Sequence, residues 1–176
     1  QYLLKENPDL YKDRSSFFKD ERFTIAGEKM SLDDVEHGMI RDSRVKLSYG
    51  HLKDPFASKF EKKFRVSEVD WRIHFALNCG AKSCPPVSFY KVETLDEQLE
   101  KSAQAYLKRE VKFNQKENKV YVPRLMDWFR ADFEGKDGII KILKNYQLIP
   151  TSSDPEVEFL DYNWELDLDN YSNNSN

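Results

Sequence analysis

The sequence predicts an α+β fold, in which a small mixed or antiparallel sheet with hairpins packs against several amphipathic helices. Stretches with helical periodicity and short alternating stretches interleave without a regular strand–helix–strand rhythm. Hydrophobic residues make up 39% of the 176 residues and aromatic residues 14%, so the chain can bury a core rich in Phe and Tyr. No internal repeat or linker divides it. We therefore expect a single globular domain over residues 1–169.

The two ends of the chain carry separate expectations. Residues 1–6 resemble the end of a helix that begins upstream of residue 1 and is stopped by Pro8. The Asn/Ser-rich residues 170–176 are expected to be disordered. Because the sequence begins with Gln1 and not with Met, a cytoplasmic and an exported location both stay open.

The first half of the chain contains a predicted hairpin and a predicted helix. Residues 23–30 alternate and turn at Gly27. Ser31 is the expected N-cap of the helix that follows. Gly38 falls in the middle of this helix, where glycine costs about 1 kcal/mol relative to Ala, so a close neighbour is expected there. The expected apolar face of the helix consists of Leu32, Val35, Met39 and Ile40. A further helix is expected where Phe56, Phe60 and Phe64 recur at four-residue spacing, as on one helix face.

The second half predicts more elements, each from its local pattern. Residues 72–78 alternate as a buried strand does, and residues 94–97 form a capping box for a helix reaching Leu107. The remaining expected elements are a hairpin of residues 111–113 and 120–122, helices over 125–133 and 137–146, and a terminal strand over 157–166.

Composition and missing motifs exclude several functions. With 31 acidic and 28 basic residues, the net charge of −3 argues against a general nucleic-acid binder. No apolar run approaches the ~18 residues that span a bilayer. The sequence has no P-loop, GxGxxG or GxSxG motif, and we expect no cofactor.

The segment from His74 to Pro86 is the strongest candidate for chemistry. It contains both cysteines and one of the three histidines, and it ends in a Gly/Ser/Pro-rich loop after an apolar run. Cys84 lies on that loop behind Lys82 and Ser83, and nearby positive charge could lower its pKa. A thiol nucleophile needs a base, for which His74 and His37 are the candidates. It also needs a group that orients the base, for which Glu36, Asn78 and Asp132 are the candidates. The alternative is that Cys84 is a packed structural thiol.

Other interpretations of the two cysteines are weaker. Cys79 is expected to be buried and structural. The four residues between Cys79 and Cys84 differ from the two-residue spacer of redox motifs, which disfavours an oxidoreductase. Zinc bound by His74 and the two cysteines would lack a fourth ligand, so no metal site is expected.

Glu36 and His37 form a second candidate group. Glu36 falls within the apolar stripe of its predicted helix, where a buried acid needs a partner, and His37 follows it directly. Glu36 could orient a histidine or bind a substrate amine.

Several segments together are similar to the domain-of-unknown-function 547 family. The most specific is residues 72–86, and the resemblance runs in order from about residue 25 to residue 166. The other matching segments are 25–27 with 31–41, 95–99, 128–133 and 161–166. The resemblance stresses Glu36, His37, His74 and Cys84, a combination similar in kind to papain-like and transglutaminase-like thiol enzymes.

Two hypotheses follow from these residues. The first is a cysteine-dependent hydrolase or acyl transferase acting on an amide or thioester of a small molecule or peptide, with Cys84, His74, His37 and Glu36 in the active site. The second is a binding or scaffold module with a buried His/Cys/Glu network. For the first, the expected substrate contacts are Asn78, Arg41, Ser83 and Trp128.

Overall fold

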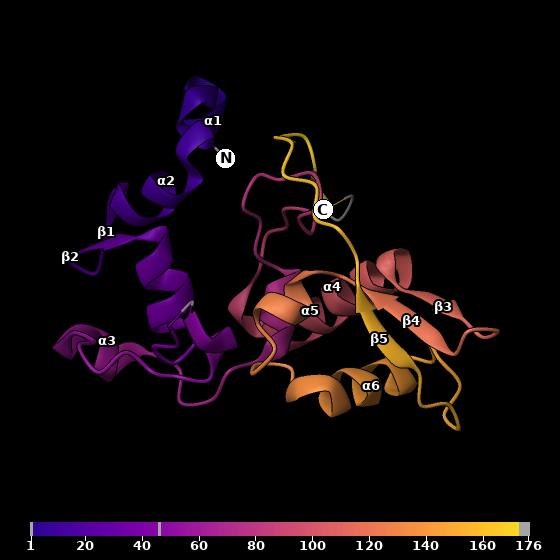
Figure 1. Cartoon of the computed structure of the whole chain (residues 1–176). Coiled ribbons are helices and arrows are strands. Elements are labelled where there is room, and N and C mark those ends of the chain that lie inside the picture. Colours follow the sequence, from indigo (N-terminus) through magenta and orange to yellow (C-terminus); the bar gives the residue numbers. More distant parts are fainter. Residues whose placement is uncertain (1, 46, 173–176) are drawn as a thin grey trace. The chain divides into compact units, whose positions relative to one another are not determined.

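The computed structural model describes residues 2–45 and 47–172, which form short helices and two small sheets of an α+β fold. The chain divides into two compact units, residues 1–70 and 71–176, and each is considered by itself (Figure 1). The expectation of one domain over 1–169 stays a prediction. Residues 173–176 of the expected disordered tail lie outside the described residues, whereas residues 170 and 172 hydrogen-bond to the backbone of Val87.

The first unit consists of short helices around a two-stranded hairpin. Its helices are α1 (Tyr2–Glu6), η1 (Pro8–Asp13), α2 (Arg14–Asp20), η2 (Asp34–Met39), η3 (Leu47–Gly50) and α3 (Lys59–Phe64). Its strands are β1 (Arg22–Ile25) and β2 (Glu28–Ser31), paired antiparallel. Ala26 and Gly27 connect them with φ values of 51° and 87°, the left-handed conformations that a tight two-residue hairpin turn requires. The predicted hairpin is confirmed.

The helix predicted after Ser31 is present, but η2 is a π-helix. Its backbone bonds reach five residues back, from Ile40 N to Val35 O at 3.0 Å and from Ser43 N to Gly38 O at 2.9 Å. The wider turn changes which residues face inward. Leu32 of the predicted apolar face is 38% exposed, whereas Arg41 is fully buried. The apolar face predicted from α-helical spacing is therefore wrong in part.

Gly38 has the close neighbour that its position predicted. A Cβ atom placed there would lie 3.0 Å from Cδ of Glu61, so the side chain of Glu61 occupies the space next to this glycine. The helix predicted from Phe56, Phe60 and Phe64 is shorter than expected. Helix α3 begins only at Lys59, and Phe56 is 90% exposed.

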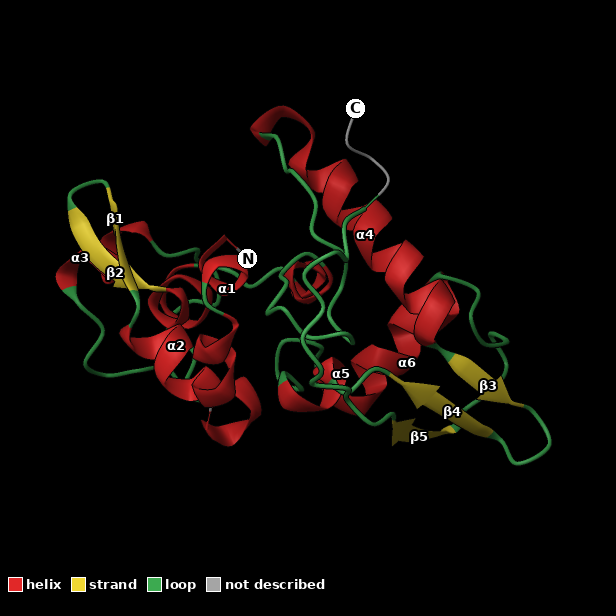
Figure 2. Ribbon diagram, turned by 90° about the horizontal axis from the view of Figure 1, so that it is seen from above, coloured by secondary structure: helices red, strands yellow, loops and turns green. Residues whose placement is uncertain are grey.

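The second unit combines a mixed three-stranded sheet with helices. Strand β4 (Lys119–Val122) lies between β3 (Lys112–Asn114), to which it is antiparallel, and β5 (Glu156–Phe159), to which it is parallel (Figure 2). The predicted hairpin and the first part of the predicted terminal strand are confirmed. The helices are η4 (Trp71–Phe75), η5 (Val92–Thr94), α4 (Leu95–Glu110), α5 (Leu125–Trp128) and α6 (Gly135–Asn145).

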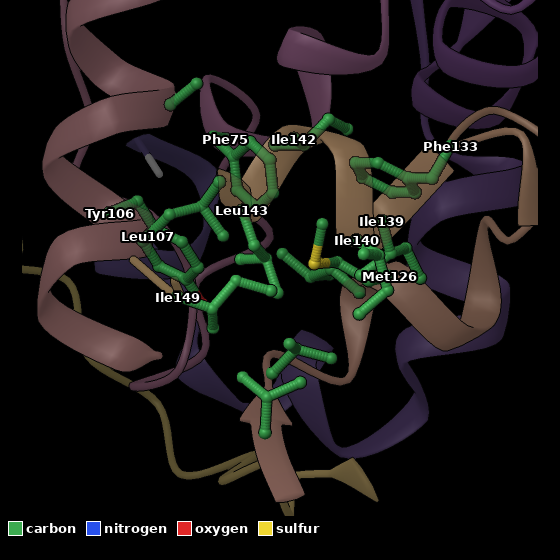
Figure 3. Packing of buried hydrophobic residues seen from close by; sticks show 14 residues of the cluster. Phe75, Tyr106, Leu107, Met126, Phe133, Ile139, Ile140, Ile142, Leu143 and Ile149 are labelled. Atoms are coloured by element: carbon green, nitrogen blue, oxygen red, sulfur yellow. The ribbon is translucent and has the colours of Figure 1, made fainter. Parts of the chain in front are cut away.

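The core of this unit lies between α4, α6 and the sheet. Figure 3 shows the side chains of Leu107, Phe75 and Ile149 gathered about Leu143. Each apolar side chain buried in this way contributes about 1.5–3 kcal/mol relative to an exposed position. The fully buried Val120 and Val122 join the sheet to the same core. This core fixes η4 and α4, which flank the candidate thiol loop in sequence.

Residues 72–78 do not form the predicted strand. They begin within η4, a 3₁₀-helix, and both His74 and Phe75 are buried, although strand alternation would place them on opposite faces. Arg72 pairs with Asp96 at 2.6 Å and Glu100 at 3.3 Å, which ties η4 to α4. The alternation of seven residues was too short to distinguish a strand from a helical turn.

The remaining differences concern helix ends. The helix predicted over 125–133 ends at Trp128, where the next residue, Phe129, leaves helical geometry with φ −110° and ψ 33°. Glu134 takes a left-handed φ of 57°, and α6 begins directly after it at Gly135. Thr94 makes no capping bond, so the predicted capping box is absent; its hydroxyl donates to Oε1 of Gln98 at 3.2 Å.

Candidate thiol site

The loop after η4 brings the two cysteines together. Asn78 holds it at both ends: its Oδ1 accepts a hydrogen bond from Gly80 N at 2.8 Å, and its Nδ2 donates to Pro85 O at 2.7 Å. Gly80 has a φ of 87°, and Cys84 N donates to Ala81 O at 2.9 Å to close a turn. Asn78, predicted to contact substrate, thus sets the conformation of the loop.

The two thiols lie in direct contact. The Sγ atoms of Cys79 and Cys84 are 2.6 Å apart, and both cysteines are free. Cys79 also donates its backbone N–H to Cys84 Sγ at 3.0 Å. The hydroxyl of Tyr162 lies 3.2 Å from Cys84 Sγ and 3.3 Å from Cys79 Sγ. Three groups that can donate a hydrogen bond therefore surround the sulfur of Cys84.

This arrangement makes the two cysteines chemically unequal. The hydrogen bond from the Cys79 thiol, followed by those from Tyr162 and the Cys79 backbone, outweighs burial and lowers the pKa of Cys84 to about 6. The same thiol–thiol bond, together with burial, raises the pKa of Cys79 far above its ordinary value. Burial and the nearby thiol charges raise the pKa of Tyr162, which keeps its hydroxyl a donor. The favoured anion is the Cys84 thiolate.

Cys84, not Cys79, is the more buried thiol. The exposed fraction of Cys84 is 2%, and Cys79 is partly buried. Cys79 is therefore less buried than Cys84, and its expected structural role stays a prediction. Its backbone N–H and its thiol face the sulfur of Cys84, so its position in the loop makes it a hydrogen-bond donor as well as a packed group.

A C-terminal segment covers the thiol loop. Residues 161–172 run beside it (Figure 1), and backbone bonds join Lys82 N to Glu165 O and Asp167 N to Gly80 O, both at 2.8 Å. Ser83 exchanges bonds with Asn163, whose N–H donates to Ser83 Oγ at 2.8 Å. We call residues 161–172 the strap. The strap carries Tyr162 to the thiols.

Ser83 and Trp128, predicted to contact substrate, both pack against parts of this site. The carbonyl of Ser83 accepts a hydrogen bond from the Tyr106 hydroxyl at 2.7 Å. The ring of Trp128 lies 4.8 Å from that of Tyr162 and 5.4 Å from that of Trp164, measured between centroids. Trp164 is 38% exposed, so the three rings form an aromatic cluster that begins at the thiols and reaches the surface. Their role in substrate binding stays a prediction.

His74 is paired with a carboxylate. Its Nε2 lies 2.7 Å from Oδ2 of Asp132, and its ring stacks on Phe129 with centroids 4.0 Å apart and an interplanar angle of 12°. The His74 and Asp132 side chains are almost fully buried. Among the described residues of this unit, Cys84 Sγ hydrogen-bonds to Cys79 and Tyr162 and not to His74. The role of His74 as a base stays a prediction.

Glu36, His37 and Arg41 lie in the first unit. Ser31 and Asp34 cap the start of their helix reciprocally, with bonds of 2.9 and 3.0 Å. Arg41 Nη1 lies 2.7 Å from Nδ1 of His37, and because a guanidinium only donates, the His37 proton resides on Nε2. That Nε2 is 3.9 Å from carboxylate oxygens of Asp33 and Glu36.

Asp132, Tyr162 and Trp164 were not predicted as members of the site. Asp132 was one of three candidates for the group that orients a histidine. Tyr162 and Trp164 alternate in the segment Asp161-Tyr162-Asn163-Trp164. The signals available for them were this alternation of aromatic residues and the family resemblance of residues 161–166.

The described residues contain no group of three or more His, Cys, Asp or Glu side chains arranged to hold a metal ion. Among them, no helix has the length and hydrophobicity needed to cross a bilayer.

Comparison with known proteins gives one result. Residues 1–107 match the family described as "Protein of unknown function, DUF547". No curated protein and no solved structure matches the chain. The matched region includes the π-helix with Glu36 and His37, the 3₁₀-helix with His74, and the loop with both cysteines. The chain therefore belongs to the DUF547 family of proteins of unknown function.

Proposed function

We propose that the chain is a thiol-dependent hydrolase or acyl transferase with Cys84 as its nucleophile. The observation that carries this proposal is the convergence of the Cys79 thiol, the Cys79 N–H and the Tyr162 hydroxyl on Cys84 Sγ. A pKa of about 6 leaves this sulfur ionised at neutral pH, and the thiolate is the reactive form of cysteine.

The proposed reaction starts with attack of the Cys84 thiolate on the carbonyl carbon of an amide or thioester. The tetrahedral intermediate collapses, the bond from carbon to the leaving nitrogen or sulfur breaks, and a thioester to Cys84 remains. Water or an acceptor amine then attacks this thioester and restores the thiolate. His74, oriented by Asp132, is the proposed base: it gives a proton to an amine leaving group and takes one back from the attacking water or amine. The role of His37 as the alternative base, and that of Glu36 as a group that orients a histidine or binds a substrate amine, stay predictions.

Access to the sulfur is a requirement of this proposal. Because Cys84 is 2% exposed and Tyr162 lies over it, a substrate carbonyl reaches the sulfur only when the strap moves away from the loop. The exposed Trp164 on the same strap is then a contact for the acyl group of the substrate, beside the predicted contact Trp128. The predicted likeness to papain-like and transglutaminase-like enzymes stays a prediction.

Alkylation with iodoacetamide across pH tests the nucleophile. We expect the rate at Cys84, measured by peptide mass spectrometry, to reach half its maximum near pH 6, whereas an unfolded control follows the ordinary thiol value of 9.0. Acyl transfer itself is tested with p-nitrophenyl acetate, which should leave one acetyl group on Cys84. Cys84→Ser is the matched control.

The variants His74→Ala, His37→Ala and Glu36→Gln test the other proposed roles. A variant that lowers acetyl transfer but leaves the pH profile of alkylation unchanged affects the reaction without changing the thiol. If Cys84 reacts at the free-thiol rate and no variant changes either measurement, the enzyme proposal is wrong.

Burial favours a second candidate, a non-catalytic binding or scaffold module. The exposed fractions are 2% for Cys84, 3% for His74 and 6% for Asp132, as in a closed polar network of a core. In that case Cys84→Ser should lower the melting temperature and leave binding of a partner unchanged. An enzyme should instead tolerate Cys84→Ser structurally and lose acyl transfer.

A further inference from the structure

The contact between the two thiols points to chemistry that acyl transfer does not use. The Sγ atoms of Cys79 and Cys84 are 2.6 Å apart. A disulfide bond is about 2.05 Å long, so about half an ångström separates the present arrangement from a bonded one. The spacing of the two cysteines in sequence argued against a redox pair, but their placement in space favours one.

The backbone of the loop already has the conformation that brings these sulfurs together. The Asn78 side chain joins the two ends of the loop, and the turn from Ala81 to Cys84 folds it back. Closing a short loop in a flexible chain would require these turns to form first. Here hydrogen bonds that involve neither sulfur hold them, so bond formation requires no refolding of the loop.

The surroundings assign different roles to the two sulfurs. Cys84 Sγ accepts from the backbone N–H of Cys79 and from the Tyr162 hydroxyl, which stabilise a negative charge on it. Cys79 Sγ keeps its proton and stands beside it as a second thiol. A reactive thiolate next to a resolving thiol is the arrangement by which proteins convert a sulfenic acid to a disulfide.

We propose that Cys79 and Cys84 are a reversible oxidation site that reacts with a hydroperoxide and forms an intrachain disulfide. The Cys84 thiolate attacks the outer peroxide oxygen, the O–O bond breaks, and the departing oxygen takes up a proton to give water or an alcohol. Cys84 is now a sulfenic acid. The sulfur of Cys79 attacks that of Cys84, the S–O bond breaks, and water leaves with the Cys79 proton. Two thiols have lost two electrons to one peroxide.

This oxidation does not depend on the proposed acyl transfer, because it needs only the two thiols and a peroxide. A peroxide is also much smaller than an acyl substrate, so the strap can stay in place over a sulfur that is 2% exposed. If both proposals hold, the disulfide removes the nucleophile, and oxidation switches the enzyme off.

Intact mass spectrometry of the reduced chain after treatment with hydrogen peroxide tests the proposal. We expect the wild type to lose both alkylatable thiols without gaining oxygen, and dithiothreitol to restore them. Cys79→Ser should instead gain oxygen on Cys84, detected with dimedone as a sulfenic acid and later as a sulfinic acid. In Cys84→Ser, the remaining Cys79 should react at least tenfold more slowly than Cys84 does in Cys79→Ser.

Three outcomes would overturn the inference. One is a wild type that accumulates oxygen on Cys84 as fast as Cys79→Ser does. Another is disulfide-linked dimers in place of the intrachain bond, and the third is a wild type unreactive at a peroxide dose that oxidises the unfolded chain. Circular dichroism shows whether each serine variant is folded, and Cys79→Ala serves as a second variant if Cys79→Ser is not. Because the measurement is a mass and not an activity, failure of acyl transfer leaves it unaffected.

Discussion

Cys79 and Cys84 show how one residue type acquires two opposite properties over five positions of sequence. The environment of Cys84 consists of donors, whereas the nearest partner of Cys79 is the sulfur that holds the negative charge. Swapping the roles would require a different loop backbone, since only the N–H of Cys79 points at the other sulfur. The acidity of Cys84 therefore belongs to the loop and to the strap residue Tyr162.

The residue that lowers the pKa of Cys84 most is Cys79. Cys79→Ala should raise the pKa of Cys84 from about 6 toward its ordinary value of 9.0, because the largest stabilising hydrogen bond is lost. Tyr162→Phe should raise it by less, since that bond contributes less. The thiolate absorbance in the ultraviolet, titrated against pH, measures both shifts. A larger shift for Tyr162→Phe than for Cys79→Ala would contradict this order.

The His74–Asp132 pair makes a second prediction at the scale of one residue. Asp132→Asn should lower the free energy of unfolding by about 1–3 kcal/mol, because the buried imidazole loses its charged partner. Glu97→Gln is the matched control: its partner Lys101 is exposed, so the loss should be below about 0.5 kcal/mol. Urea denaturation measures both. Equal losses would show that the buried pair has no special role in stability.

Individual elements show where sequence patterns were sufficient. Both hairpins follow from alternation and turn residues, and α4 and α6 follow from helical periodicity over more than ten residues. The predictions that the structure contradicts concern short elements. The segment 72–78 alternates for only seven residues, and the π-helix changes the face that a 3.6-residue period predicts. The local sequence pattern cannot indicate the 3₁₀-helix or the π-helix, because tertiary contacts decide which of these conformations forms.

In the candidate site, too, the sequence predicted neighbours along the chain but not contacts between distant residues. Cys84 and its loop were found because they are contiguous in sequence. Tyr162, however, is 78 residues away from Cys84, and the partner of His74 is 58 residues away from it. A single sequence contains no signal for such pairs beyond residue type. The segment around Tyr162 was predicted as the end of a strand, without its partner.

Gly138 and Gly38 predict unequal costs for the same substitution. A Cβ atom at Gly138 of α6 would lie 2.0 Å from the carbonyl oxygen of Phe133, which is backbone and cannot move aside. Gly138→Ala should therefore lower the free energy of unfolding by more than about 2 kcal/mol. At Gly38 the neighbour is the Glu61 side chain at 3.0 Å, which can shift. Gly38→Ala should be near neutral, because the gain in helix propensity of about 1 kcal/mol offsets the displacement. Thermal melts compare the two variants, and a greater loss at Gly38 would be evidence against this account.

For the whole molecule, the thiol pair predicts how stability depends on pH. The folded-state pKa of Cys84 is depressed to about 6, so the stability gained from its ionisation is absent below pH 6 and grows as pH rises toward the unfolded value of 9.0. Above that value the sign reverses, because Cys79, with its raised pKa, ionises only in the unfolded chain. Each proton difference contributes a slope of about 1.4 kcal/mol per pH unit.

Urea denaturation of the wild type and of the double variant Cys79→Ser/Cys84→Ser measures this dependence. The difference between their free energies of unfolding should rise from pH 6, reach a maximum near pH 9 and then fall. Taking the difference removes the titration of the carboxylates and histidines that both proteins share. A difference that stays flat across this range would show that no thiolate forms in the folded protein.

During synthesis, the two cysteines are made well before the strap that covers them. Ribosomes add roughly 5–20 residues per second, so the 78 residues between Cys84 and Tyr162 take roughly 4–16 s to synthesise. During that interval both cysteines have left the ribosome before their tyrosine cover exists. A nascent chain is thus open to mixed disulfides with bulky thiols, which the strap of the finished fold keeps away from the buried Cys84. Growth under thiol stress should therefore damage newly made copies of this protein more than old ones.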